Sequence, residues 1–267
     1  MKGDEMRGAV RVQIASDLNH EFATGNSPWR QPLSTSESAD LLVLAGNVHT
    51  NTQGVELYRH AGVPVVYVNG THELWGGEVS ETRAALRAAA EGTCVSYLEC
   101  DELRFGRVRV LGCCLWTDYL LGPSRREHAM DEARRFLNDH RLIRLGARQF
   151  SPEDALAEHQ KSRRWLEEKL GCSFRGKTIV VTHFSPVVES FSQFDNNPLN
   201  ASDASNLRSL VEGVDLWIHG RIERSARLRI GDALVVCNPR GFPQVGKPGR
   251  HMCSQNAQFD PGLIIEV

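Results

Sequence analysis

The stretch "DLLVLAGNVHT", from Asp40 to Thr50, is an apolar run that ends in a glycine and a polar side chain. The segment Leu41–Ala45 predicts a buried strand, because a short continuous apolar run bounded by turn residues is typical of strands covered on both faces. Gly46 suits a tight turn. Ligand sites in open α/β sheets lie just beyond the carboxyl ends of strands, so Asn47 is a candidate site residue.

The same pattern of apolar strand and polar turn recurs along the chain. Further strands are predicted at 10–16 and within "GVPVVYVNG", "KTIVVTHFSP" and "DLWIHGR", and "DELRFGRVRVLGCC" predicts a hairpin. Helices are predicted at 53–61, 80–92 with Ser80 as N-cap, 125–137, and 152–170 with Ser151 as N-cap. We expect the turns to converge on one cleft, namely 17–22, 46–50, 69–75, 183–186 and 219–224.

Composition narrows the class of protein. The 267 residues are 41% hydrophobic and 24% charged, which suits a single α/β domain over residues 1–267. A net charge of −2 argues against a general nucleic-acid binder, and the longest apolar runs are too short for a membrane span. The seven cysteines have no C-x-x-C spacing, so we expect reduced thiols in the cytoplasm, with the vicinal pair Cys113–Cys114 as the one redox candidate.

The five turns carry a family resemblance. In order they read "SDLNHEF", "LAGNVHT", "NGTHELW", "VVTHFSP" and "IHGRIER". This series resembles the blocks D-x-H, G-D, G-N-H-[DE], H and G-H-x-H of the calcineurin-like metallophosphoesterases. The stretches "LNDHRLI", "NPLNASDAS" and "VVCNPRGF" also resemble bacterial members of this length. The resemblance implies an α/β fold of four layers, α-β-β-α, with two mixed sheets in the middle.

The resemblance also implies a ligand set for two metal ions. Its seven positions are held here by Asp17, Asn19, Asn47, Thr71, His183, Arg221 and Glu223. Only Asp17 and His183 keep the family's residue. Asn47 stands at the position of the bridging aspartate, and Arg221 stands at that of a ligating histidine.

The substitutions change the electrostatics of such a site. Two divalent ions about 4 Å apart repel by on the order of 15–20 kcal/mol at an effective dielectric near 20, and a bridging carboxylate offsets much of this. Asn47 has no charge, and the guanidinium of Arg221 is a cation without a lone pair. We therefore expect no dinuclear centre. In its place we expect Arg221 to pair with Asp17 or Glu223, because a carboxylate left in the cleft without a cation is costly.

A one-metal site is the alternative. Asp17, Asn19 and Glu223, with help from His20 or His49, form an oxygen-rich set that suits a single Mn²⁺ or Mg²⁺.

His72 is kept from the third block, where the family's histidine donates a proton to the leaving group. It is a candidate general acid, or else a hydrogen-bonded residue of the cleft wall.

Two functions remain open from the sequence, besides a pure scaffold that binds no ligand. The first is an inactive or weak homologue without a metal cofactor, which binds a phosphate-bearing small molecule or a protein partner. Arg221, His72 and the backbone amides of the turns are the expected binding groups. The second is an active metal-dependent phosphoesterase that uses one metal ion or a rearranged ligand set.

Overall fold

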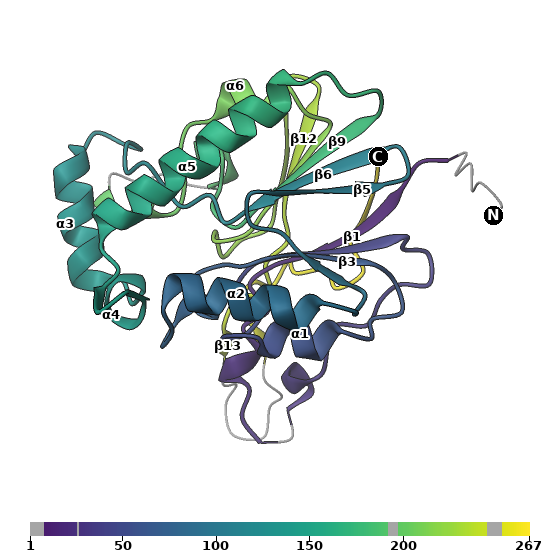
Figure 1. Ribbon diagram of the computed structural model, residues 1–267, viewed down its shortest axis with the longest axis horizontal. Coiled ribbons are helices and arrows are strands. Elements are labelled where there is room, and N and C mark those ends of the chain that lie inside the picture. Colours follow the sequence, from purple (N-terminus) through teal and green to yellow (C-terminus); the bar gives the residue numbers. More distant parts are fainter. Residues whose placement is uncertain (1–7, 26, 192–196, 245–252) are drawn as a thin grey trace.

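The computed structural model describes residues 8–25, 27–191, 197–244 and 253–267, and Figure 1 shows two sheets between helices. The first sheet has five strands. In spatial order they are β15 (Ile264–Glu266), β1 (Arg11–Ala15), β2 (Leu41–Ala45), β3 (Val65–Val68) and β4 (Val95–Tyr97). Strands β1 to β4 run parallel and β15 is antiparallel to β1, so this sheet is mixed.

The second sheet has six strands. In spatial order they are β11 (Ala226–Ile230), β12 (Ala233–Cys237), β10 (Leu216–His219), β9 (Lys177–Thr182), β6 (Val108–Cys113) and β5 (Asp101–Phe105). The four inner strands are parallel, and the two edge strands are antiparallel to their neighbours. β5 and β6 form the predicted hairpin.

Three apolar clusters separate the layers. One lies between the sheets and includes Val12 and Val181; a second packs helices α1 (Gln53–Tyr58) and α2 (Val79–Ala90) on the first sheet. The third packs the second sheet against α5 (Pro152–Gly171) and its neighbours. The predicted α-β-β-α sandwich is confirmed. The remaining elements are α3 (Arg126–Phe136), α4 (Asp139–Leu142), α6 (Arg208–Val211), and the short strands β7 (Arg144–Leu145), β8 (Arg148–Gln149), β13 (Pro243–Gln244) and β14 (Cys253–Ser254).

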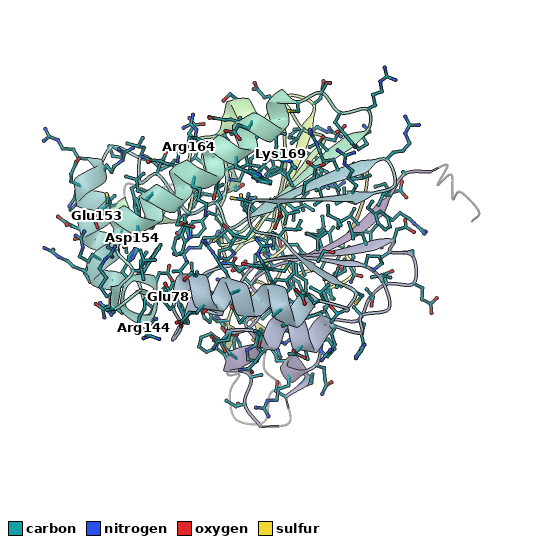
Figure 2. All side chains as sticks on the ribbon, viewed as in Figure 1. Glu78, Arg144, Glu153, Asp154, Arg164 and Lys169 are labelled. Atoms are coloured by element: carbon teal, nitrogen blue, oxygen red, sulfur yellow. The ribbon has the colours of Figure 1, made fainter. Side chains whose placement is uncertain are left out.

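Helix ends follow local hydrogen bonding. Ser151 and Asp154 form the capping box of α5, which confirms its predicted start. The prediction that Ser80 caps the second helix is wrong, because Glu78 accepts the Glu81 N–H at 2.9 Å and α2 begins at Val79. Charged side chains gather on the outside of the helices, as at Glu153 and Arg164 of α5 (Figure 2). No helix of the described residues is both long and apolar enough to cross a membrane.

The polar turns follow the carboxyl ends of the parallel strands, as predicted, and they have unusual backbones. Asp17, Asn19, Asn47 and Arg221 have φ values of 47°, 49°, 53° and 67°. Asn and Asp tolerate this left-handed region, whereas for arginine it is uncommon and indicates that surrounding contacts hold it.

Gly46 allows the turn after β2 to approach its neighbours. Its φ is +85°, and a Cβ atom there would lie 2.5 Å from His183 Nδ1 and 2.7 Å from the Gly70 nitrogen. The β2, β3 and β9 turns therefore meet only because this position carries no side chain.

We predict that Gly46→Ala destabilises the protein more than Gly62→Ala. Gly62 has a similar φ of +80° but nothing within 4 Å of a Cβ atom, so it reports backbone strain alone, about 1–2 kcal/mol. Gly46→Ala adds steric overlap and should cost roughly 3 kcal/mol or more in the free energy of unfolding. Urea unfolding measures both variants, and equal losses would show that the close approach at Gly46 is not required.

Candidate functional site

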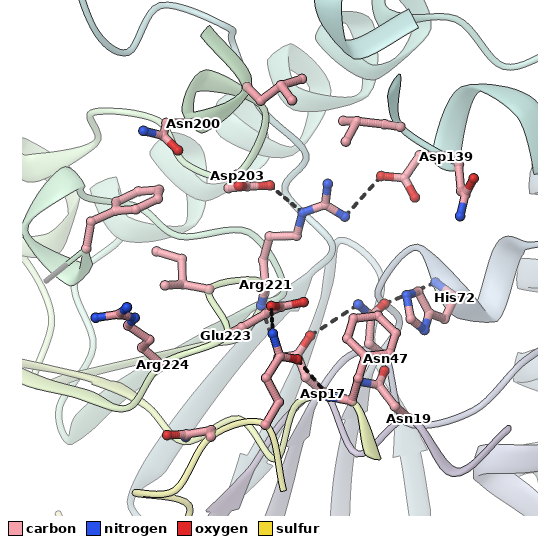
Figure 3. Close-up of a pocket in the computed structure, with 18 of the residues that line it drawn as sticks. Asp17, Asn19, Asn47, His72, Asp139, Asn200, Asp203, Arg221, Glu223 and Arg224 are labelled. Carbon is pink, nitrogen blue, oxygen red and sulfur yellow. Dashed lines mark hydrogen bonds and ion pairs between the residues drawn. The ribbon is translucent and has the colours of Figure 1, made fainter. Parts of the chain in front are cut away.

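A cleft of about 1100 Å³ opens where the strand-end turns meet (Figure 3). Its wall combines carboxylates, amides and aromatic rings. The lining residues used below are Asp17, Asn19, Asn47, His72, Trp75, Phe136, Asp139, Asp203, Arg221, Glu223, Arg224, Phe242 and Gln255. Asp17, Asn19, Asn47, His72, Arg221 and Glu223 were candidates from the sequence, whereas Asp139 and Asp203 were not.

Asn47 ties three turns together through its side-chain amide. Its Nδ2 group donates to Asp17 Oδ1 at 3.1 Å, and its Oδ1 atom accepts the N–H groups of Thr71 at 2.9 Å and His72 at 3.0 Å. A carboxylate accepts hydrogen bonds but has no N–H group, so an aspartate here would lose the bond to Asp17. The amide can donate to the Asp17 carboxylate and at the same time accept from the N–H groups of Thr71 and His72. It therefore links these turns without a cation between them.

Asp17 is buried beneath this amide. The exposed fraction of the residue is 3%, and its Oδ2 atom accepts the backbone N–H of Arg221 at 3.1 Å. Burial raises the pKa of this carboxyl group to about 7. A large share of Asp17 is therefore protonated, and thus uncharged, near neutral pH.

The guanidinium of Arg221 lies between two other aspartates (Figure 3). Its Nε donates to Asp203 Oδ1 at 2.7 Å, and Nη1 donates to Asp139 Oδ2 at 3.0 Å. Nη1 also lies 3.3 Å from Thr71 Oγ1, and the guanidinium stacks 4.9 Å from the ring centre of Phe184. The side chain thus fills space beside Thr71, one of the family's ligand positions.

The expectation that Arg221 pairs with Asp17 or Glu223 is wrong. Arg221 reaches Asp17 only through its backbone N–H, which leaves the side chain to extend away from that carboxylate. Glu223 is exposed and accepts a hydrogen bond from the side-chain amide of Gln255.

Two carboxylates share this one guanidinium. Burial alone would raise the pKa of Asp139, but the charge of Arg221 and a bond from Trp75 Nε1, at 3.0 Å, lower it to about 2. For Asp203, burial outweighs the attraction of Arg221 and raises the pKa. Asp139 is therefore the ionised partner of Arg221. Arg221, Asp139 and Asp203 together carry no excess positive charge.

His72 stands at the wall of the cleft. Its Nδ1 donates to Glu21 Oε1 at 2.6 Å, and its ring centre lies 3.7 Å from that of Trp75. The next residue, Glu73, is wholly buried and accepts the N–H groups of Asn47, Val48 and Gly70. Glu73 thus holds the turns together, and His72 faces the cleft.

The remaining histidines of the turns do not join Asp17. His183 is fully buried, and its Nδ1 donates to the Ala45 carbonyl at 3.0 Å; burial and the charge of Arg221 lower its pKa to about 3. His20 bonds to the Trp29 carbonyl and to the Tyr58 hydroxyl, and His49 Nδ1 accepts its neighbour's N–H. Over the ranges the structure describes, no three His, Cys, Asp or Glu side chains are grouped to hold a metal ion.

Asn19 offers a buried acceptor. The residue is 2% exposed, and its Oδ1 atom has no hydrogen-bond partner within the described part of the chain. Together with Asp17 and Glu223 it makes up the oxygen donors at the family's first-metal positions.

Solved structures match most of the length of this chain. The chain aligns with a phosphopantetheinyl hydrolase (PptH) from Mycobacterium tuberculosis with a TM-score of 0.68 and 17% identity, over 96% of this chain and 99% of that one. A putative 5'-nucleotidase from Staphylococcus aureus gives a TM-score of 0.47 at 13% identity, over 86% of this chain and 48% of that one. The calcineurin-like phosphoesterase YfkN from Bacillus subtilis gives 0.38 at 12% identity, over 86% and 81%.

The match to the hydrolase confirms the predicted fold. At 17% identity it shows the fold alone, and the two lower TM-scores carry no argument. No protein-family model and no curated protein sequence matches the chain.

We predict that Asn47→Asp destabilises the protein, and more so as pH rises. The new carboxylate would face Asp17 at the 3.1 Å now spanned by a hydrogen bond. Two carboxylates this close share a proton at low pH and repel at high pH, so we expect a loss of about 2–4 kcal/mol at pH 8 and less at pH 5.

Thermal and urea unfolding at both pH values measure this loss. Asn206→Asp, the same change at an exposed position, is the matched control and should be nearly neutral. A loss at Asn47 that does not depend on pH would contradict the proposed contact between the two carboxyl groups.

We predict that Arg221→Met costs roughly 3–5 kcal/mol, because it leaves the buried Asp139 and the half-buried Asp203 without a cation. Adding Asp139→Asn and Asp203→Asn to the same variant should restore most of that loss. Arg227→Met, at an exposed site in β11, is the control for the change of side chain. If the triple variant is as unstable as Arg221→Met, packing rather than charge is what Arg221 provides.

Proposed function

We propose that this chain is a metallophosphoesterase-fold protein that does not hydrolyse phosphate esters at an appreciable rate and uses its cleft to bind a ligand. The observation that supports this most directly is the side-chain amide of Asn47, whose N–H group faces Asp17. In the resembling family this position bridges two metal ions with a carboxylate.

The residues present do not fit two metal ions. Both ends of the Asn47 amide are already bonded, Nδ2 to Asp17 and Oδ1 to two backbone N–H groups. The guanidinium of Arg221 lies against Thr71, where a second ion would have to sit, and two like cations in one small site repel strongly. The donor set therefore disfavours a dinuclear centre.

Without such a centre the cleft has no evident nucleophile. A metal ion supplies hydroxide at neutral pH by lowering the pKa of its bound water. His72 still stands in place to give a proton to a leaving group, yet its Nδ1 is bonded to Glu21, and no other side chain of the cleft replaces the hydroxide. Proton donation alone does not cleave a phosphate ester.

A phosphate-bearing small molecule or a protein partner remains the ligand proposed from the sequence, but the expected binding groups are in use. Arg221 is bonded to Asp139 and Asp203, and the N–H groups of Asn47, Gly70, Thr71 and His72 donate to Glu73 or Asn47. Such a ligand would have to displace these internal hydrogen bonds, which weakens the support for this ligand class.

A second ligand class is favoured by charge. Among the residues that the structure describes, four acids line the cleft, of which Asp17 is partly uncharged near neutral pH, and two arginines stand against them. Aromatic rings line the same space, and Phe136 is 60% exposed. A ligand with amine or hydroxyl donors and an apolar part complements this wall, since acids accept hydrogen bonds and rings attract cations.

The alternative of a one-metal phosphoesterase has weaker support. Of its proposed ligands, His20 and His49 are bonded elsewhere and Glu223 is exposed beside Gln255. Asp17 and Asn19 remain, and two oxygen donors are few for Mn²⁺ or Mg²⁺.

The proposed cytoplasmic location rests on the seven cysteines, all of which are free thiols.

Metal content and turnover test this proposal. We predict that protein dialysed against Mn²⁺ retains less than one ion per chain and does not cleave an aryl phosphodiester above the buffer rate. The matched variant restores the family's residues, as Asn19→His, Asn47→Asp, Thr71→Asn, Arg221→His and Glu223→His together, and it should take up metal. Metal-dependent turnover by the natural chain that Asp17→Ala abolishes would overturn the proposal.

Thermal shift separates the ligand classes. Phosphate and adenosine monophosphate represent the first class, and spermidine represents the second. We expect a shift with spermidine that Asp203→Asn weakens, whereas a shift only with the phosphates would favour the first class.

A further inference from the structure

Two cysteines meet at the open end of the β5–β6 hairpin. The antiparallel register pairs Phe105 with Val108 at the turn and ends with Asp101 opposite Gly112. An extension of this register by one residue would place Cys100 opposite Cys113. Regular pairing stops there because Cys100 has a left-handed backbone, with φ of 52°.

Their side chains share one environment. Cys113 is wholly buried in the cluster between the second sheet and α5, and Cys100 packs against the same cluster while half-buried. Cys100 Sγ lies 3.7 Å from Ser162 Oγ of α5, which places it on the helix side of the sheet. Directly opposed residues in antiparallel strands lie within the Cα separation that disulfides require.

The two thiols differ in reactivity. The neighbouring Cys113 thiol lowers the pKa of Cys100, and the charge of Lys161 acts in the same direction. Burial raises the pKa of Cys113 well above its usual value. Since the thiolate is the nucleophile, Cys100 is the first of the pair to react, and Cys113 is held beside it.

We propose that Cys100 and Cys113 are a peroxide-sensitive dithiol that closes to a cross-strand disulfide. The Cys100 thiolate attacks one peroxide oxygen, which breaks the O–O bond and gives a sulfenic acid and hydroxide. The Cys113 sulfur then attacks the Cys100 sulfur and loses its proton as the S–O bond breaks and water leaves. In sum, two thiols lose two electrons and two protons, and the peroxide is reduced to two waters.

The sequence offered the vicinal pair Cys113–Cys114 as its one redox candidate. Both of these thiols are wholly buried, whereas Cys100 is only half-buried and so more open to an oxidant. A chain of contacts connects the neighbour of Cys113 to the cleft. The Cys114 carbonyl accepts the backbone N–H groups of His183 and Phe184, and the Phe184 ring supports Arg221.

Peptide mapping without reductant tests the proposal. The exposed thiols Cys172 and Cys253 are first replaced by serine, so that they neither crosslink chains nor consume oxidant. This background protein is treated with hydrogen peroxide, alkylated and digested with trypsin. We expect the peptide that contains Cys100 to be joined to the peptide that contains Cys113, and dithiothreitol should separate them.

Single variants identify the two sulfurs. Cys94 and Cys114 lie on the same two tryptic peptides, so Cys94→Ser and Cys114→Ser should keep the crosslink, whereas Cys100→Ser should lose it. Cys113→Ala is the small apolar variant for the buried position, and its circular dichroism spectrum checks the fold. A crosslink that survives Cys100→Ser, or oxidation to sulfinic acid with no crosslink in a folded protein, would overturn the proposal.

Discussion

The side-chain amide of Asn47 is the interaction on which the rest of the site depends. It donates to Asp17 and accepts two backbone N–H groups from the β3 turn, so it joins the ends of β1, β2 and β3 through hydrogen bonds. In the resembling family, a carboxylate at this position holds metal ions. Here the same turns meet without them, because an amide supplies both a donor and an acceptor where a carboxylate supplies acceptors alone.

Around Arg221, the charges are likewise balanced by side chains of the protein itself. Asp139, at the start of α4, and Asp203 share one permanent cation, which sits beside Thr71. A buried carboxylate without a partner is costly, so the arginine stabilises the buried Asp139 and the half-buried Asp203. Internal ion pairs therefore line the cleft beside Thr71.

The inner strands could be predicted because most of them are short apolar runs followed by a polar turn, whereas the four layers came from the family resemblance. The sequence also predicts the loss of the metal-bridging carboxylate, because the residue at this position is Asn47. The partners of Arg221 were not, because Asp203 lies 18 residues away in sequence and Asp139 lies 82. An arginine side chain is long enough to reach several acids. Which acids Arg221 contacts depends on the direction of its side chain, and the backbone hydrogen bond to Asp17, which no sequence pattern reveals, helps to set that direction.

Anomalous diffraction from crystals soaked in Mn²⁺ tests the central claim most directly, because it locates ions and side chains in one experiment. The account predicts no manganese peak between Asp17, Asn47 and Arg221, with the guanidinium in hydrogen-bonding reach of Asp139 and Asp203. Two manganese peaks flanking Asn47, with Arg221 displaced from the cleft, would contradict it.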